Sequence, residues 1–490
     1  MFSCQTYFLK NCLNKQSRKK KKEIFRSYSF FPIKKPYIMD KKKVIVIGAG
    51  CAGLSATYTL LKNCIDVVTF EAEDSAGGRC RTITDQGYTF SMGAGSTEPQ
   101  WETTFQYLKK LELMDRVFSI QKQRYGFPRN GKIRTVFIGG NFWEMVKALP
   151  ENLKFFCNGF PLKTYPQLLK VFMALSKYMK LVDKKNQNFD CLAEISSIST
   201  EEFVLKYGGP EALNWMFHPF LATMIMGRPK DISISHPISL FSLMKGMRSL
   251  DGGLGVLTEK LYQKVKDSVK LSTKVKKVVI RDNKVTGVET ENGFVEGDHV
   301  ICAVDAIIAR QLIPDLPETM RAPLETCRYS STYYYQFGLE KHFLPASTDF
   351  FVLMIPASEN TILGWAAKGS RSGEKPVMIF TTRGWKDERL LKMTDQERRK
   401  LVIREAQRYF PEFPDEPLVT KVFRWDRAVN METPGQFVAI QDLLKNHMRD
   451  VEGLYLAGEY LFLIASTEGA LATGKKAAEM VIEDLQKISK

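Results

Sequence analysis

Apolar positions follow a strand, turn, helix and strand order at the start of the chain. Lys43–Ile47 is a short β-branched apolar run, which predicts a buried strand. Gly48–Gly53 then predicts a turn, Leu54–Asn63 a helix and Val67–Phe70 a second buried strand. Two buried strands joined by one helix form a βαβ unit. An α/β fold is therefore predicted from this part of the chain onward.

Later segments alternate between helical spacing and short apolar runs. Helical spacing predicts helices over residues 101–118, Pro166–Asp183 and 200–216. Short apolar runs between polar turns predict strands at Val269–Ser272, Val275–Ile280, Lys284–Thr290, Phe294–Glu296, His299–Ala303, Thr332–Leu339, Phe350–Ile355 and Val377–Thr382. Helices are also predicted at Val256–Val265 and Asp395–Tyr409. The chain is expected to end with a strand at Leu454–Ala457 and a helix over Thr467–Gln486.

The order of these elements predicts two domains. Residues 41–100, 236–324 and 446–490 are expected to form one Rossmann-like α/β domain. Residues 101–235 and 325–445 are expected to form an inserted, two-piece α+β domain that selects the substrate. Residues 1–40 are predicted to be a basic, disordered tail.

The charge of the chain is concentrated in that tail. The net charge is +17, and the first 38 residues hold ten Lys or Arg but one acid, Glu23. The run Arg18–Lys22 is typical of a solvated arm, of residues upstream of a true start at Met39, or of a mitochondrial-type presequence. We expect no nucleic-acid partner. The predicted location is cytoplasmic or peripheral to a membrane, or organellar if the tail is a transit peptide.

Cysteine usage and composition exclude other classes. Hydrophobic residues at 44% and charged residues at 26% are ordinary for a globular protein. Nine cysteines, widely spaced and without a CxxC pair, favour a reducing compartment and predict no metal site. The longest uncharged run, Val44–Leu61, contains three glycines and belongs to the βαβ unit, so no membrane span is predicted.

A dinucleotide motif follows the first strand. Gly48-Ala49-Gly50-Cys51-Ala52-Gly53 has the form GxGxxG, and Glu71 ends the next strand. Gly48 permits a tight turn, Gly50 lets a pyrophosphate approach the backbone, and Gly53 lets helix and strand pack closely. Glu71 can accept hydrogen bonds from a ribose diol and should repel a 2′-phosphate. The motif alone fits NAD or FAD.

The next segment resembles the FAD-dependent amine oxidase superfamily, which includes protoporphyrinogen oxidases and carotenoid desaturases. Glu71 to Arg79, EAEDSAGGR, matches the family pattern E-A-x-x-R-x-G-G-R except that Ser75 replaces the first arginine. Phe90–Ala94, Val275, Leu454–Glu459 and Ala465–Ala470 resemble further family segments. The resemblance implies FAD, held by Gly48, Gly50, Cys51, Ala52, Gly53, Glu71, Ala72, Gly78, Arg79, Gly93, Ala94, Val275, Gly458, Glu459, Thr467, Glu468, Gly469 and Ala470.

The branch of the family is decided by fewer residues. Amine oxidases carry an aromatic residue where this chain has Ser466, and a lysine on a strand that resembles Ser330–Leu339, which has none. No cysteine follows Cys327, so the flavin is expected to be non-covalent. Gly458–Gly474 resembles plant-type desaturases. The resemblance implies dehydrogenation of a small hydrophobic substrate, with hydride passing to flavin N5 and electrons to O₂ or a quinone. An amine or amino-acid oxidase and a redox-inert flavin protein stay open as alternatives.

Candidate side chains for the substrate pocket are fewer still. Tyr460, Tyr335, Trp365 and Met92 lie on segments expected to pass the flavin, although each also fits an ordinary core position. His218 lies in an apolar stretch and is interpreted as a satisfied core histidine rather than a catalytic base. The lysine-rich helix Pro166–Asp183 fits either peripheral membrane contact or a packed helix with a solvated lysine face.

Overall fold

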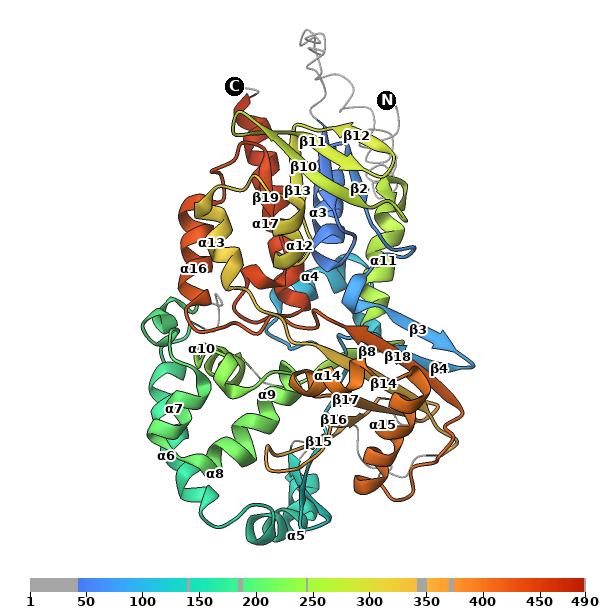
Figure 1. Cartoon of the computed structure of the whole chain (residues 1–490), viewed down its shortest axis with the longest axis vertical. Coiled ribbons are helices and arrows are strands. Elements are labelled where there is room, and N and C mark those ends of the chain that lie inside the picture. The colour runs from blue at the N-terminus through green and yellow to red at the C-terminus, as the bar shows by residue number, and fades with distance from the viewer. Residues whose placement is uncertain are drawn as a thin grey trace, which may run out of the picture.

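The predicted βαβ unit forms the centre of a five-stranded parallel sheet, in the upper half of Figure 1. The structure is a computed structural model that describes residues 43–138, 142–183, 188–243, 246–341, 350–369 and 374–488. The predicted tail, residues 1–40, lies outside them. The strand order is β19 (Leu454–Leu456), β13 (His299–Cys302), β1 (Val44–Ile47), β2 (Val67–Phe70) and β9 (Val269–Lys270). The α/β class predicted from the sequence is confirmed.

Helices and a small antiparallel sheet bury the parallel sheet. All four residues of β1 are buried, because they pack with apolar residues of α3 (Cys51–Lys62), α17 (Thr467–Ile488) and the small sheet. That small sheet is β10 (Val275–Arg281), β11 (Lys284–Thr290) and β12 (Gly293–Glu296). Other helices of this half are α4 (Glu102–Lys110), α11 (Gly255–Val265), α12 (Ala306–Leu312), α13 (Glu318–Thr326) and α16 (Gln436–Asp442).

A seven-stranded mixed sheet lies in the lower half (Figure 1). Its order is β18 (Val419–Trp425), β14 (Thr332–Gly338), β17 (Val377–Thr382), β16 (Leu363–Lys368), β15 (Phe350–Met354), β6 (Gln123–Arg129) and β7 (Lys132–Ile138). The helices α14 (Asp387–Leu391) and α15 (Asp395–Tyr409) follow β17 along the chain, and α15 packs on one face of the sheet. The sheet therefore joins strands from two distant stretches of the sequence.

Helices fill the rest of the lower half. They are α5 (Phe142–Asn158), α6 (Thr164–Met179), α7 (Thr200–Tyr207), α8 (Pro210–Ala212), α9 (His218–Met224) and α10 (Ser235–Leu243). Two antiparallel pairs complete the sheets: the hairpin of β3 (Thr82–Asp85) with β4 (Tyr88–Ser91), and β5 (Val117–Ser119) with the distant β8 (Arg248–Leu250). Within the described ranges, no helix has the length and apolar character needed to cross a bilayer.

The helix predicted at Pro166–Asp183 spans Thr164–Met179. Two other predicted helices end much earlier than expected. The helix predicted over 101–118 ends at Lys110, and residues 117–119 form strand β5. The helix predicted over 200–216 ends at Tyr207, because Gly208 and Gly209 follow and Gly209 has a φ of +132°. A short helix and a π-helical turn, Leu213–Phe217, then lead to His218.

Candidate cofactor and substrate site

Three glycines shape the turn between β1 and α3. Gly48 has a φ of +94°, which side chains other than glycine rarely adopt. A Cβ on Gly53 would lie 1.8 Å from the Gly48 carbonyl oxygen, so only glycine allows this helix to approach the turn. A Cβ on Gly50 would meet no atom within 4 Å. Gly50 therefore faces open space, as a backbone that a ligand approaches should.

The N-terminus of α3 is free to bind an anion. No side chain caps it, and its first turn holds no acidic residue. The first backbone N–H groups of a helix have no partner within the helix, and the helix dipole adds partial positive charge there. A hydrogen bond with Cys80, together with burial, raises the pKa of the Cys51 thiol. Cys51 is therefore neutral at pH 7 and does not repel a phosphate.

Glu71 closes the turn from the second strand. Its carboxylate accepts hydrogen bonds from the Ala49 N–H at 2.7 Å and the Glu73 N–H at 3.0 Å. The Thr273 N–H donates to the Glu71 carbonyl oxygen at 2.8 Å, which brings the start of β10, with Val275, beside Glu71. Ala72 follows and is exposed. Glu71, Ala72 and Val275 thus lie together at one end of the turn.

Arg79 joins the other segments to this turn. A Cβ on Gly78 would lie 3.5 Å from the Gly50 Cα, so the two loops are close. The Ala94 N–H donates to the Arg79 carbonyl oxygen at 3.1 Å, and a Cβ on Gly93 would lie 2.7 Å from that oxygen. The Arg79 guanidinium forms an ion pair with Glu459 at 2.8 Å and donates to the Ala428 carbonyl oxygen.

The first turn of α17 packs beside the same loops. A Cβ on Gly474 would lie 2.0 Å from the Ala52 carbonyl oxygen, so α17 and α3 are in close backbone contact. Thr467, Glu468, Gly469 and Ala470 form the first turn of α17. The Glu468 carboxylate accepts from the N–H groups of Thr103 and Thr104 at 2.9 and 2.7 Å. Glu468 therefore stabilises the N-terminus of α4.

Ser466 has a structural role at the start of α17. Its Oγ accepts from the Gly469 N–H at 3.2 Å and donates to the Ile464 carbonyl oxygen at 2.8 Å. A serine here caps a helix, which an aromatic residue cannot do. The capping role of Ser466 thus explains why a serine, and not the aromatic residue of amine oxidases, stands at this position.

FAD fits this arrangement. Eighteen residues were predicted as cofactor-binding, and the structure gathers their segments around Gly50 and the free N-terminus of α3. The open space at Gly50, the uncapped helix end and the nearby Glu71 are what the phosphates and ribose of a dinucleotide require. Arg81 lies in the same loop as Arg79; its Nε lies 3.1 Å from the Met92 sulfur and its guanidinium contacts Ser75.

Met92 lies where the two halves of the molecule meet. Its carbonyl oxygen accepts from the Trp425 indole N–H at 2.8 Å, and the Gln336 amide donates to the Ser91 carbonyl oxygen at 2.6 Å. Trp425 and Gln336 were missed, because they contact Met92 and Ser91 from strands far away in the sequence. They form the boundary between the cofactor segments and the seven-stranded sheet.

Trp365 and Tyr334 share one face of that sheet. Their ring centroids are 6.1 Å apart, and both pack with Tyr88 and Phe90 of β4. The Trp365 indole nitrogen is buried and has no hydrogen-bond partner in the part of the chain that the structure describes. Burial raises the pKa of Tyr334, so its hydroxyl stays protonated. This face holds aromatic rings with a spare hydrogen-bond donor.

Two predicted pocket residues lie elsewhere. Tyr335 points to the opposite face of β14 and packs beneath α15, because neighbouring residues of a strand face opposite sides. Tyr460 is buried in the core of the parallel-sheet half, and its hydroxyl has no partner among the described residues. Tyr334, which the sequence analysis passed over, shares the sheet face of Trp365.

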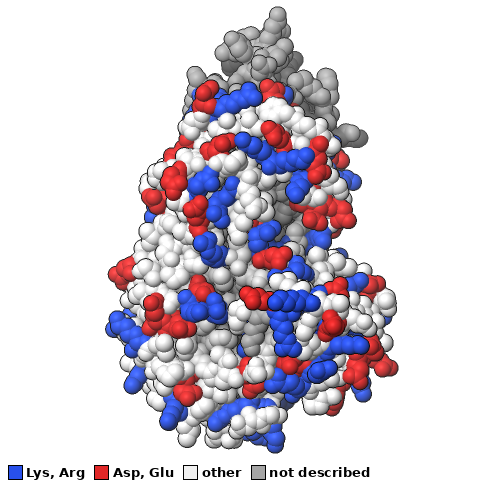
Figure 2. All heavy atoms as spheres, viewed as in Figure 1, with Lys and Arg blue, Asp and Glu red and all other residues white. Residues whose placement is uncertain are grey.

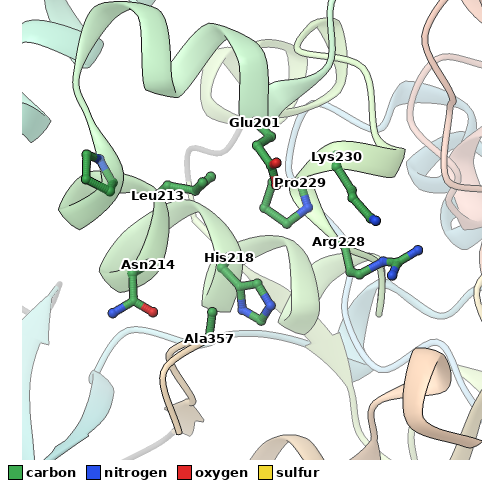
Figure 3. Close-up of a pocket in the computed structure, with 9 residues that line it drawn as sticks. Glu201, Leu213, Asn214, His218, Arg228, Pro229, Lys230 and Ala357 are labelled. Atoms are coloured by element: carbon green, nitrogen blue, oxygen red, sulfur yellow. The ribbon is translucent and has the colours of Figure 1, made fainter.

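His218 lines a separate cavity of about 170 Å³ between the helices (Figure 3). Figure 3 shows its ring between Asn214 on one side and Arg228 and Lys230 on the other. His218 is 9% exposed, and its Nδ1 is buried with no partner among residues that the structure describes. Burial, helped by the nearby Arg383 cation, lowers the pKa of His218 to about 4. The ring is buried and neutral, as expected of a core histidine, but its Nδ1 lacks the hydrogen bond that a satisfied core histidine would make among the described residues.

A comparison with known families identifies the chain. The family described as flavin containing amine oxidoreductase matches residues 51–482. The protein belongs to this family. The members of this family are described as flavin-containing oxidoreductases.

Relatives of known activity have different substrates. The chain is 27% identical over 325 residues to a 1-hydroxycarotenoid 3,4-desaturase of Flavobacterium sp., covering 62% of this chain and 64% of the relative. It is 28% identical over 226 residues to the mitochondrial protoporphyrinogen oxidase of Nicotiana tabacum, covering 46% and 40%. It is 25% identical over 306 residues to the L-amino-acid oxidase of Protobothrops flavoviridis, covering 60% and 58%. The matches span 40% to 64% of these relatives' lengths.

Solved structures show the same fold. Cyclohexylamine oxidase from Brevibacterium oxydans superposes with a TM-score of 0.71 at 17% identity, covering 91% of this chain and 100% of that chain. The two halves of this protein thus follow the fold of FAD-binding amine oxidases.

Proposed function

We propose that this protein dehydrogenates a hydrophobic substrate of the polyene or porphyrinogen type. Bound flavin supplies the hydride acceptor at N5. The free N-terminus of α3 binds the pyrophosphate, and Glu71 accepts hydrogen bonds from the adenosine ribose. Trp365 and Tyr334 provide an apolar, aromatic wall for the substrate.

The hydrogen-bond and ion-pair partners of the nearby carboxylates support this substrate class. A cationic amine requires a carboxylate or an aromatic cage. Glu71 holds the Ala49 N–H, Glu459 pairs with Arg79, and Glu468 holds two N–H groups of α4. The cage position is Ser466, which caps α17. The observation that carries the proposal is thus that Glu459 and Glu468 are bound to protein partners and that Ser466 stands at the cage position.

The proposal also assigns cofactor binding and substrate binding to different halves of the molecule. We propose that residues 101–235 and 325–445 form an inserted substrate domain. The seven-stranded sheet supports this, because β6 and β7 come from the first stretch and β14 to β18 from the second. We also propose a non-covalent flavin that is reoxidised by O₂ or a quinone, because no cysteine follows Cys327.

Anaerobic titration of the purified holoenzyme tests the substrate class. The substrates are a polyene, a porphyrinogen, an L-amino acid and an alkylamine. We expect the flavin band near ~450 nm to bleach with the polyene or the porphyrinogen and to stay unchanged with the other two. Bleaching by an amine or amino acid would overturn the hydrophobic assignment. Readmission of O₂ or a quinone then identifies the acceptor.

The amino-acid oxidase alternative has one point in its favour. The L-amino-acid oxidase of Protobothrops flavoviridis is among the relatives, and its match covers 60% of this chain. That activity releases hydrogen peroxide when O₂ reoxidises the flavin. A peroxide assay with a panel of L-amino acids distinguishes the alternatives, and we expect no signal above the substrate-free control.

A further inference from the structure

Helix α5 presents its apolar side chains outward. Phe142 and Trp143, at the start of α5, are 72% and 70% exposed. Leu162, in the turn that follows the helix, is 76% exposed. Further exposed apolar side chains on α5 are Met145, Val146, Leu149, Leu153 and Phe156. Their spacing of three and four residues places them along one stripe of the helix. A helix of an ordinary soluble surface shows the reverse pattern.

The polar residues of α5 point inward instead. Glu144 forms an ion pair with Lys122 at 2.9 Å, and Glu151 forms one with Arg124 at 3.2 Å. The Asn152 side chain bonds both the N–H and the carbonyl oxygen of Phe137 on β7. The polar side of α5 therefore faces the β6–β7 hairpin, which fixes the apolar stripe toward the outside.

Lysines accompany the apolar stripe. Lys147 and Lys154 on α5 and Lys170 and Lys177 on α6 are exposed, and none forms an ion pair with another described residue. Helix α6 has no acidic residue and adds the exposed Leu169 and Met173. Figure 1 places α5 at the lower tip, and Figure 2 shows that tip as mostly white with blue.

We propose that α5, the turn at Leu162 and α6 dock this protein on an anionic lipid membrane. The aromatic and aliphatic side chains of α5 enter the boundary between headgroups and acyl chains, and the lysines contact acidic headgroups. The exposed apolar side chains run along the length of α5, so this helix lies in the plane of the membrane with its apolar stripe toward the acyl chains.

Charge distinguishes a membrane from a second copy of the chain. Two copies docked face to face would bring the same unpaired lysines together, which is repulsive. An anionic bilayer offers the opposite charge beside an apolar layer. The apolar side chains of this surface match the acyl layer of a bilayer, and its unpaired lysines match the anionic headgroups.

Vesicle flotation of the full-length holoenzyme tests the proposal. Vesicles of phosphatidylserine with phosphatidylcholine are compared with vesicles of phosphatidylcholine alone. The test variant carries Trp143→Gln, Leu149→Gln and Leu153→Gln, all on exposed positions. We expect the acidic vesicles to bind the wild-type protein and the triple variant to bind at least about tenfold more weakly.

A matched control separates this surface from apolar exposure in general. Phe294→Gln, Leu391→Gln and Leu418→Gln remove exposed apolar side chains on β12, on α14 and before β18. We expect this variant to float like the wild type. Lys147→Gln with Lys154→Gln should weaken binding to acidic vesicles by roughly tenfold or more, and high salt should do the same.

Two results would overturn the proposal. One is a triple variant that floats as well as the wild type, which would assign vesicle binding to another part of the chain. The other is a wild type that does not float but sediments as a dimer, with the triple variant monomeric, which would make α5 an interface between copies. Flavin content and the unfolding temperature, measured on every variant, show that each one is folded.

Discussion

At the scale of single residues, two glycines of the cofactor turn separate packing from ligand binding. Gly53 has no room for a Cβ, whereas Gly50 has open space and an ordinary φ of −74°. We expect Gly53→Ala to destabilise the protein by about 1–3 kcal/mol, because helix and turn must move apart. We expect Gly50→Ala to keep the stability of the apoprotein and to weaken FAD binding by about tenfold, or 1.4 kcal/mol.

Thermal unfolding of the apoproteins and FAD titration of each variant check this pair. The wild-type protein is the reference, and its Ala49 shows that this turn accepts a Cβ at a neighbouring position. If Gly50→Ala bound FAD as tightly as the wild type, the pyrophosphate could not lie at this turn. If Gly50→Ala lowered apoprotein stability, the space at Gly50 would be filled by protein.

His218 predicts a pH dependence of stability. Its pKa is lowered from about 6.5 to about 4 by burial, so the unfolded chain binds a proton more readily than the folded protein. The contribution of His218 to stability is therefore complete above pH 6.5 and is lost as the pH falls toward 4. The upper bound on this loss is about 3 kcal/mol. We expect His218→Asn to lose less stability than the wild type over this range.

Urea unfolding at a series of pH values between 4 and 7 measures the difference. The stability of the variant at neutral pH does not test the prediction. The informative quantity is the slope of the free energy of unfolding against pH. Parallel slopes for the two proteins would show that His218 titrates normally in the folded state.

The residues of the cofactor turn were predictable because their signals are local. Gly48, Gly50, Gly53 and Glu71 lie within one βαβ unit, where spacing along the chain fixes distance in space. The substrate wall was less predictable. All seven residues of β14 are buried, so the strand has no alternation to show which face meets the cofactor. Tyr335 and Tyr334 cannot be distinguished without the neighbouring sheet.

At the scale of elements, Glu468 connects two helices. Its carboxylate caps α4 through Thr103 and Thr104, although the family resemblance placed it with the flavin. We expect Glu468→Ala to lower the free energy of unfolding by about 1–2 kcal/mol, because α4 loses its cap. Glu468→Gln keeps one acceptor oxygen and should lose less.

Denaturant unfolding and FAD affinity, measured together, separate the two roles. A cap predicts lower stability with FAD affinity changed little once the protein is folded. A large fall in FAD affinity with unchanged apoprotein stability would instead make Glu468 a cofactor ligand.

Elements were predictable to different extents. The helix predicted at Asp395–Tyr409 has those bounds in the structure, because Thr394 and Glu397 form a capping box at its start. The β6–β7 hairpin was not predicted. Its strands carry Arg124, Arg129 and Arg134, and β6 contains Pro128, so neither strand shows a clear apolar period. Pairing with β15 from a distant part of the chain decides its structure.

At the scale of the whole molecule, the cofactor site is built from six separate stretches of chain. The loop after β2, the segment after β4, the start of β10, the loop after β19 and helix α17 are joined to the turn after β1 through contacts of Gly50, Ala52, Glu71 and Arg79. Their order along the chain was readable from motifs, but their meeting depends on the parallel sheet that joins β1, β2, β13 and β19. A ligand that binds between such segments stabilises the folded state as a whole.

This arrangement predicts that stability depends on FAD concentration. A non-covalent ligand that binds only the folded state adds about 2.7 kcal/mol when its concentration is 100 times Kd. We expect the apoprotein to unfold at a lower temperature than the holoenzyme, and added FAD to raise that temperature progressively. Acid precipitation should release the flavin into the supernatant. A flavin that stays with the precipitated polypeptide would contradict the non-covalent assignment, and an unfolding temperature independent of FAD would show that these segments assemble without it.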